Sequence, residues 1–402
     1  QVYARAYRPG DPYSLETELR PAIEPLIEAA AELDGALEAL RRPMKTLHDG
    51  LMARLDDEAE ELDGDTRRRI EATCRSLNRR GLMQARAWRD MLAAAREPAG
   101  PDEFVDWLMV ERADGRDIDV GLHRHWVDPT LPFAQTVASP SQGLVVTSAT
   151  LTDGSGDREA DWQAAELRTG AVHLPEPAVR AEVKSPFDYA GHTRVYVVTD
   201  VRKDDLNQVA AAYRALFLAA NGGALGLFTA ISRLRAVHGR IGEPLEDAGL
   251  TLLAQHVDGL DVSTLVDIFR AEEDACLLGT DAVRDGVDVP GRALRLIVFD
   301  RVPWPRPDIR HKARRERFGK RRYDDMLTRL RLKQAYGRLI RRADDHGVFV
   351  LLDPMMPTRL TGAFPDGVEV HRVGLAEAVR ATRGFLHPDA DGDGAEGGGP
   401  SA

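Results

Sequence analysis

The second half of this chain alternates short apolar runs with helical stretches, and this alternation limits the folds open to it. The runs with strand composition lie at 194–200, 223–229, 250–256, 275–279, 294–300 and 347–353. The helical stretches lie near 205–220, 231–240, 262–272 and 323–343. Short β-branched runs separated by helices predict βαβ units, in which a parallel sheet is covered by helices on both faces. The fold class expected for this part is therefore α/β.

The N-terminal part has a different pattern. Leu19, Ile23, Leu26, Ala30 and Leu33 recur at spacings of three and four residues, which is typical of an amphipathic helix. Residues 14–97 are predicted to be helical, with a turn and a helix N-cap at 63–65. Prolines at 98 and 101 end this region, and residues 103–151 are predicted to be rich in strand, including strands at 104–110 and 143–147.

Composition excludes several classes of protein. A hydrophobic content of 43% supports a packed core, and a net charge of -11 argues against a uniformly basic nucleic-acid coat. The chain has no apolar run of 18 residues, so we expect no membrane span, and its N-terminus lacks a charged-then-apolar signal. The cytoplasmic location that we expect rests on the cysteines. The chain begins at Gln1 rather than at Met, which we expect of an excised or engineered segment, with processing as the alternative.

Cysteine usage bears on compartment and cofactors. Cys74 and Cys276 are far apart in the sequence, which suits a reducing cytosol and gives no disulfide framework. Two isolated cysteines cannot ligate a four-cysteine iron–sulfur cluster, so none is expected in this segment. No cluster of His, Cys and Asp has zinc spacing, and no metal ligand is assigned.

A Q-x-x-G-R-x-x-R run occupies residues 334–341 and places Arg338 and Arg341 three residues apart. This spacing predicts that both lie on one face of a helix. An arginine side chain keeps its charge, and its planar fork matches phosphate oxygens. Such a pair suits the sensing and stabilisation of the γ-phosphate of ATP during hydrolysis. A solvated basic helix face is the alternative interpretation.

This run resembles motif VI of superfamily 2 helicases, and other runs resemble further helicase motifs in the same order. Residues 144–151 are similar to motif III, 185–189 to a signature of the DinG/XPD-like branch, 226–230 to motif IV, and 279–280 with 285–291 to motif V. The chain therefore resembles the C-terminal half of a DinG/XPD-like superfamily 2 ATP-dependent DNA helicase.

The resemblance implies a domain organisation. Residues 1–99 would form an all-helical, arch-like domain, although an ordinary helical hairpin would give the same pattern. Residues 100–152 would be a β-rich return segment that ends in motif III, at the end of the first motor domain. Residues 153–387 would form the RecA-like parallel-sheet second motor domain, and residues 388–402, rich in Gly and Asp, a disordered tail.

The resemblance also assigns residues to the ATP site. The catalytic residues would be Arg338, Arg341 and Gln334, which enter the site from the second motor domain. The residues that bind ATP or couple its site to DNA would be Asp285, Gly286, Asp288, Ser148 and Thr150. Each of these sets also has an ordinary structural interpretation, as a turn after a strand or as a helix N-cap.

DNA contacts are expected where strands end and where basic residues gather. Thr229 and Ser232 follow one strand, and Thr280 follows another at an edge where open parallel sheets bind ligands. Residues 301–322 contain ten Lys or Arg residues against two acids, which suits contact with a single-strand backbone. The candidates there are Arg314, Arg315 and Arg317. Next to Thr280, Arg284 replaces an aromatic residue that relatives carry and offers a further phosphate contact. A solvated surface is the alternative for the basic segment.

The sequence lacks a phosphate cradle. A G-x-x-x-x-G-K-[ST] loop is absent, and the acidic letters at 57–60 lie in a charged helical run rather than after an apolar strand. We therefore expect this segment to be inactive by itself. The intact enzyme would use ATP and Mg²⁺, bind single-stranded DNA, and rely on an N-terminal motor domain of the same parent chain. The alternative is a non-catalytic nucleic-acid-binding or regulatory module that retains the helicase C-terminal fold.

Overall fold

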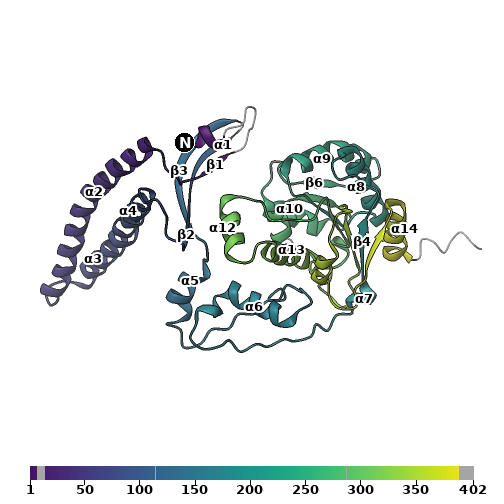
Figure 1. The fold of residues 1–402 in the computed structure, drawn as a ribbon. Helices are drawn as coiled ribbons and strands as arrows, with labels where there is room; N and C mark the ends of the chain where they lie inside the picture. The colour runs from purple at the N-terminus through teal and green to yellow at the C-terminus, as the bar shows by residue number, and fades with distance from the viewer. Residues whose placement is uncertain (7–13, 114, 287, 389–402) are drawn as a thin grey trace, which may run out of the picture. The chain divides into compact units, whose positions relative to one another are not determined.

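A computed structural model describes residues 1–6, 14–113, 115–286 and 288–388 (Figure 1). The described residues form two compact units. Unit 1 comprises residues 1–129 and 306–318, and unit 2 comprises residues 130–305 and the chain from 319 onward. The segment 306–318 thus packs with unit 1, although it lies between two strands of unit 2 in the sequence. Most of the tail expected at 388–402 lies outside the described residues.

Unit 1 contains a helical hairpin built on the long helix α2 (Glu24–Asp57). Its partners are α3 (Gly64–Ser76), the π-helical turn η1 (Leu77–Leu82) and α4 (Met83–Ala95), which lie along α2 (Figure 1). Asp63 caps α3, because its side chain accepts hydrogen bonds from the N–H groups of Asp65 and Thr66, both at 2.9 Å. The predicted N-cap at this turn is confirmed.

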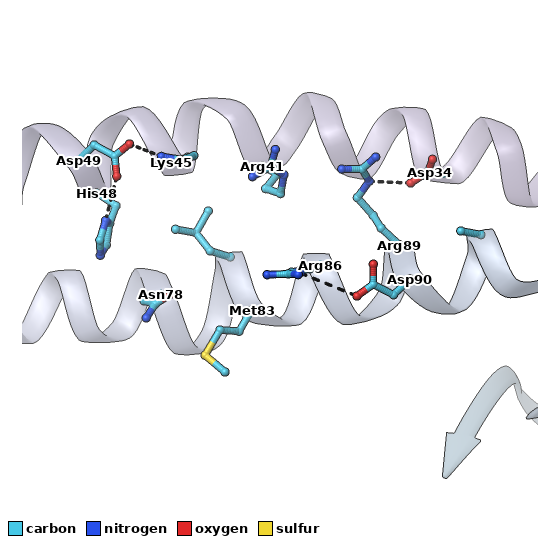
Figure 2. Close-up of a pocket in the computed structure, with 12 residues that line it drawn as sticks. Asp34, Arg41, Lys45, His48, Asp49, Asn78, Met83, Arg86, Arg89 and Asp90 are labelled. Carbon is cyan, nitrogen blue, oxygen red and sulfur yellow. Dashed lines mark hydrogen bonds and ion pairs between the residues drawn. The ribbon is translucent and has the colours of Figure 1, made fainter. Parts of the chain in front are cut away.

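A polar groove runs between α2 and α4 (Figure 2). Figure 2 shows Arg89 of α4 directed at Asp34 of α2, with Nε 2.6 Å from the carboxylate, and Arg86 directed at Asp90, 3.9 Å away. On α2, His48 lies 3.3 Å from Asp49. Acidic and basic side chains that line the groove are thus paired with one another, and we assign no site to it.

An antiparallel sheet completes unit 1. Its strand order among the described residues is β1 (Leu15–Glu18), β2 (Phe104–Ala113), β3 (Arg116–Trp126). The strand β2 confirms the one predicted at 104–110. The prediction that residues 14–97 are wholly helical is wrong at β1. In β1 the side chains of Leu15 and Thr17 are buried and those between them are less so. Burial therefore repeats every two residues, as in a strand, rather than every three or four, as in a helix. The helix α1 (Val2–Ala6) packs on β1, and α12 (Ile309–Arg317) packs on β1 and β2.

Unit 2 is built on a parallel sheet. Within the described residues it has seven strands, in the order β10-β4-β9-β8-β5-β7-β6, and every neighbouring pair is parallel. The strands are β4 (Thr193–Val198), β5 (Ala224–Leu227), β6 (Leu252–Ala254), β7 (Cys276–Gly279), β8 (Leu296–Phe299), β9 (Gly347–Leu351) and β10 (Val370–Val373). The predicted α/β class and its parallel sheet are confirmed. The strand β10 lies outside the runs that the sequence singled out.

Helices cover both faces of this sheet. On one face lie α8 (Leu206–Ala220), α9 (Ile231–Glu246) and α14 (Leu375–Leu386). On the other lie α10 (Val262–Ala271), α11 (Asp281–Gly286), α13 (Arg321–Tyr336) and the 3₁₀ turn η5 (Thr358–Ala363). Alternate residues of each strand enter the two cores: Val348 and Val350 pack on one face, whereas Phe349 and Leu351 pack on the other.

The region between β3 and β4 contains the remaining helices of unit 2. These are α5 (Thr130–Phe133), a π-helical turn at Ala134–Ala138, α6 (Arg158–Thr169), the 3₁₀ turn η3 (Ala171–His173) and α7 (Tyr189–His192). The strand predicted at 143–147 is not formed, and Val145 is 89% exposed. A strand needs a neighbour to receive its backbone hydrogen bonds, and none of the described residues pairs with this apolar run.

The predicted domain ranges 1–99, 100–152 and 153–387 concern membership of motor domains and stay a prediction. The compact units divide the described chain on a different criterion, with breaks at residues 129, 305 and 318. In the described chain none of the helices is both long and apolar enough to cross a membrane.

Phe349 tests this packing, because it is fully buried in β9 and its ring lies 5.5 Å from that of Phe299 and 5.3 Å from that of Phe364. We expect Phe349→Ala to lower the free energy of unfolding of unit 2 by about 3–5 kcal/mol, because it leaves a cavity in the core. Urea unfolding measures this. The control is Met355→Ala, at a side chain 73% exposed, which should change the value by less than about 0.5 kcal/mol. Equal effects would contradict the assigned core.

Candidate nucleotide-coupling and nucleic-acid site

The two arginines of the Q-x-x-G-R-x-x-R run lie just beyond a helix rather than within it. A helix was predicted over 323–343. The helix α13 ends earlier, at Tyr336, and Gly337 is its C-cap. The prediction that one helix face carries both arginines is therefore wrong. Leu339 and Ile340, between the arginines, are buried in the sheet core.

An aspartate fixes the turn that carries the two arginines. We call this turn, residues 337–342, the arginine turn. Asp345 is 5% exposed, and one of its carboxylate oxygens accepts hydrogen bonds from the N–H groups of Arg341 and Arg342, both at 2.7 Å. A carboxylate that accepts two backbone N–H groups holds them in one geometry, as at a helix N-terminus. Sequence reasoning missed Asp345. The only signal was an acidic residue that follows a basic turn and precedes a strand.

The structure brings these arginines to the segment that resembles motif V. Arg338 Nη2 donates to the backbone carbonyl of Asp285 at 2.9 Å, and Arg341 Nε lies 3.2 Å from the carboxylate of Asp288. Burial, and then the charge of Arg341, lower the pKa of Arg338 from its ordinary value. The guanidinium nevertheless stays charged in water at neutral pH. The cluster thus holds two close cations beside two carboxylates.

Of the other residues predicted for the ATP site, some are close in the chain to Arg338 or Asp285, and others make no hydrogen bond to either arginine within the described residues. Gly286 ends α11, directly after Asp285, and Gln334 lies exposed in the last turn of α13, four residues before Arg338. The hydroxyl oxygens of Ser148 and Thr150 lie 3.2 Å apart, within hydrogen-bonding distance, in an exposed turn. In the described chain we find no hydrogen bond between that turn and the arginine cluster.

Thr280 follows β7 at the carboxyl edge of the sheet, but its polar groups are already engaged. Its backbone N–H and its hydroxyl both donate to the side-chain carbonyl of Gln255, each at 2.9 Å. Gln255 follows β6 and is buried. Thr280 was predicted to contact DNA, and its partner Gln255 was not predicted. The signal for Gln255 was a polar residue at the end of an apolar run.

The structure does not support the phosphate contact that was predicted for Arg284, in α11. Its side chain is 6% exposed and ion-paired with Asp281 at 2.8 Å and with Asp285 at 3.0 Å. The residue thus faces the protein and holds the short helix together. A phosphate contact there would require both ion pairs to break, so we withdraw that assignment.

Thr229 and Ser232 lie exposed around the start of α9. The N-cap residue is Ala230, which has no side chain to accept a hydrogen bond from the first turn. The uncapped N–H groups of a helix attract anions. Nearby, buried Asp300 accepts from the N–H of Thr229 at 3.3 Å and pairs with Arg233 at 2.6 Å. Burial raises the pKa of Asp300, and Arg233 opposes that effect.

The basic segment forms the helix α12 in unit 1, capped by the carboxylate of Asp308. Arg314 is held by the protein itself, because it donates to the carbonyls of Val127 at 3.1 Å and Trp126 at 3.3 Å. Arg317 is exposed, and Arg315, half-buried, lies 3.9 Å from Glu316. Of the arginines assigned to DNA, Arg314 therefore fastens α12 to the end of β3, whereas Arg317 faces solvent.

The cysteines are buried in separate units. Burial raises the pKa of the Cys276 thiol to about 12, which is the behaviour of an inert core residue. The described residues contain no group of three or more His, Cys, Asp or Glu side chains that would fit a metal ion.

This chain is similar in sequence to known helicases. Residues 214–370 match the family model of the helicase C-terminal domain. ATP-dependent helicase DinG of Mycobacterium tuberculosis is 35% identical over 68% of this chain and 41% of its own. The 3′-5′ exonuclease DinG of Bacillus subtilis is 28% identical over 64% of this chain and 28% of its own. A solved structure of Saccharomyces cerevisiae Dbp5 bound to RNA and ADP BeF3 aligns with a TM-score of 0.37 at 15% identity, covering 57% and 53% of the two chains.

Most of the parallel sheet and the turn that carries Arg338 and Arg341 thus lie in a helicase C-terminal domain. More narrowly, the chain contains the C-terminal region of a DinG-like helicase. It spans 41% of the length of the mycobacterial relatives that it matches.

Asp345 gives a test of how the arginine turn is held. We expect Asp345→Ala to lower the free energy of unfolding by about 1–3 kcal/mol, since two backbone donors lose their shared acceptor. Hydrogen exchange at the amides of Arg341 and Arg342 should accelerate along with it. Asp344→Ala removes the same charge from an exposed neighbour and serves as the control. Unchanged exchange at both amides in Asp345→Ala would show that other contacts hold the turn.

Proposed function

We propose that this chain is the C-terminal portion of an ATP-dependent DNA helicase that couples ATP hydrolysis to translocation on single-stranded DNA. The observation that carries the proposal is the meeting of Arg338 and Arg341 with Asp285 and Asp288 beyond the carboxyl end of β7. Ligands of open parallel sheets bind at this edge. The mycobacterial relative is itself named an ATP-dependent helicase.

The arginine cluster suits a phosphate that arrives from outside the chain. The side chain of Arg341 is 35% exposed and that of Asp288 is 68% exposed, so their ion pair is solvated and weak. A γ-phosphate would displace Asp288 at little cost and would gain charge-assisted hydrogen bonds to Arg341. In this proposal Arg338 remains anchored on the Asp285 carbonyl and Gln334 contributes hydrogen bonds. The anchored guanidinium then links nucleotide binding to α11.

The proposal needs a second body of protein. Neither a phosphate-binding loop nor a metal-holding set of side chains occurs in the described residues, so we derive no step through Mg²⁺ here. An N-terminal motor domain of the same parent chain would hold the nucleotide phosphates and the metal. Closure of the two motor domains would bring Arg338 and Arg341 to the γ-phosphate, and this segment by itself would be inactive.

The DNA side of the proposal rests on two groups of residues in different units. In unit 2, Thr229 and Ser232 lie beside the uncapped N–H groups of α9, whereas Thr280 would have to release a donor from Gln255 before it could bind a phosphate. In unit 1, Arg315 and Arg317 lie on α12. The exposed hydroxyls of Thr229 and Ser232 and the two arginines suit contact with backbone phosphates rather than with base edges. We propose a cytoplasmic location, because free buried cysteines suit a reducing compartment.

Arg341→Ala in the full-length protein is the central test. We expect DNA-stimulated ATP hydrolysis to fall by about 10³-fold or more, the scale of an arginine that stabilises the transferring phosphoryl group. ATP binding should change far less, since the other domain would make most contacts to the nucleotide.

Arg342→Ala, a change at an exposed neighbour, is the matched control and should retain turnover. The 402-residue chain, assayed in parallel, should not hydrolyse ATP. Near-normal turnover in Arg341→Ala would refute the assignment. A full-length protein that binds DNA but never hydrolyses ATP would instead favour a non-catalytic nucleic-acid-binding module.

The basic helix gives an independent test with single-stranded DNA. We expect Arg315→Ala/Arg317→Ala to weaken binding equally for different base sequences. It should also flatten the slope of log affinity against log salt by roughly 0.7 for each lost phosphate contact. Fluorescence anisotropy of labelled oligonucleotides over a salt series measures both. Arg67→Ala/Arg75→Ala on α3 removes the same charge from unit 1 and is the control. An unchanged slope would identify α12 as a solvated surface.

A further inference from the structure

Four consecutive residues that directly follow the Ser148–Thr150 turn are each fastened to the body of unit 2. The range is 151–154, and the contacts come from α6, α13 and η5. In order along the chain, Arg168 donates to the carbonyl of Leu151, Lys333 Nζ donates to that of Thr152 at 2.9 Å, Arg329 Nε donates to the carboxylate of Asp153 at 2.9 Å, and Gly154 meets the backbone of Gly362. We call these residues the 151–154 clasp.

The ion pair in the clasp is buried. Asp153 is 1% exposed and Arg329 is 5% exposed, and both Nε and Nη2 of the arginine reach the same carboxylate oxygen. Removing one partner from such a pair leaves an uncompensated charge in the interior, which is strongly unfavourable. The pair thus permits one register between the clasp and α13. Burial also lowers the pKa of Lys333, in keeping with its enclosed position beside Thr152.

Gly154 closes the clasp on its other side. Its φ is +79°, in the left-handed region that favours glycine, and a Cβ there would overlap the carbonyl oxygen of Gly362 in η5. Backbone therefore lies directly against backbone. The same η5 turn is joined to α13 by the ion pair between Arg359 and Asp325, at 2.7 Å. Clasp, helix and turn form one packed body.

The helix that holds the clasp is the helix that leads to the arginine turn. Arg329 and Lys333 are four residues apart, so they lie on one face of α13. Gln334 follows Lys333, and the turn with Arg338 and Arg341 begins after Tyr336. An α-helix is stiff over this length. A displacement of Ser148 and Thr150 along the chain direction would therefore reach α13 through Asp153.

We propose that the buried Asp153–Arg329 pair is a positioning device that links the Ser148–Thr150 turn to the arginines of the ATP site. This inference rests on the proposed function, since it concerns how ATP hydrolysis responds to DNA. Asp153 and Arg329 touch neither nucleotide nor DNA in this scheme. They keep α13 and the hydroxyl-bearing turn moving as one body, so that a change at one end alters the placement of Arg338 and Arg341 at the other.

The test compares stimulation by DNA with basal turnover in the full-length protein. We expect Asp153→Asn and Arg329→Gln each to lower DNA-stimulated kcat by about tenfold, the scale of a coupling between sites. Basal kcat and the KM for ATP should stay within about twofold, because the groups that would contact the nucleotide remain. The charge reversal Asp153→Arg/Arg329→Asp should recover much of the stimulation. Arg202→Gln removes the exposed ion pair with Asp205 elsewhere in unit 2 and should leave stimulation unchanged.

The outcomes separate this inference from the proposed function. If Arg341→Ala retains turnover, the proposed function fails. If Arg341→Ala abolishes turnover while the Asp153 and Arg329 variants keep full stimulation, or lose basal and stimulated rates in equal proportion, only the inference is overturned. If thermal unfolding shows that Asp153→Asn does not fold, the same two rates are measured in Arg329→Lys. It keeps the buried charge but loses the forked contact, and an equal loss of both rates there would refute the positioning role.

Discussion

Burial of the parallel sheet on both faces is the constraint on which the rest of unit 2 depends. The strands β5 to β9 consist of apolar residues and glycine because helices cover them above and below, so the polar side chains of this part of the sheet lie in the residues that follow each strand. Thr229, Gln255, Thr280, Asp300 and Asp353 all occupy such positions, after β5, β6, β7, β8 and β9. Because the strands are parallel, these carboxyl ends meet at one edge. The candidate site is thus a consequence of how the core is built.

Buried carboxylates and amides then fix the groups at this edge. Asp300 holds Arg233 and the N–H of Thr229, and Gln255 holds both donors of Thr280. A polar group that is removed from water must find a partner inside the protein, and each such partner restricts the geometry of its neighbours. Side chains that sequence motifs present as free ligands therefore turn out in part to be structural, as Thr280 and Arg284 illustrate.

The arginine turn combines a rigid support with a weakly held tip. Leu339 and Ile340 are buried and Asp345 binds the backbone, whereas the Arg341 side chain remains partly exposed beside Asp288. Functional side chains on a loop held by a scaffold keep their position while remaining accessible. The 151–154 clasp extends the same principle to α13, where a buried ion pair fixes the register between two segments far apart in the sequence.

The sequence predicted the α/β class, most strands of the large sheet and the N-cap at Asp63, because these depend on local periodicity and capping chemistry. It also indicated the helicase motifs, which are contiguous runs. It did not predict β1, since four residues carry too little periodicity. It also missed the end of α13 at Tyr336, since the apolar spacing of three and four residues continues to Leu339 and Ile340. The partners of the motif residues were equally inaccessible. Gln255 meets Thr280 across 25 residues, and Asp153 meets Arg329 across 176. Local chemistry thus determined which residues are candidates. Tertiary packing alone decided which of them face solvent and which are held by the protein, because burial and the need to pair buried charges act between segments that the sequence keeps apart.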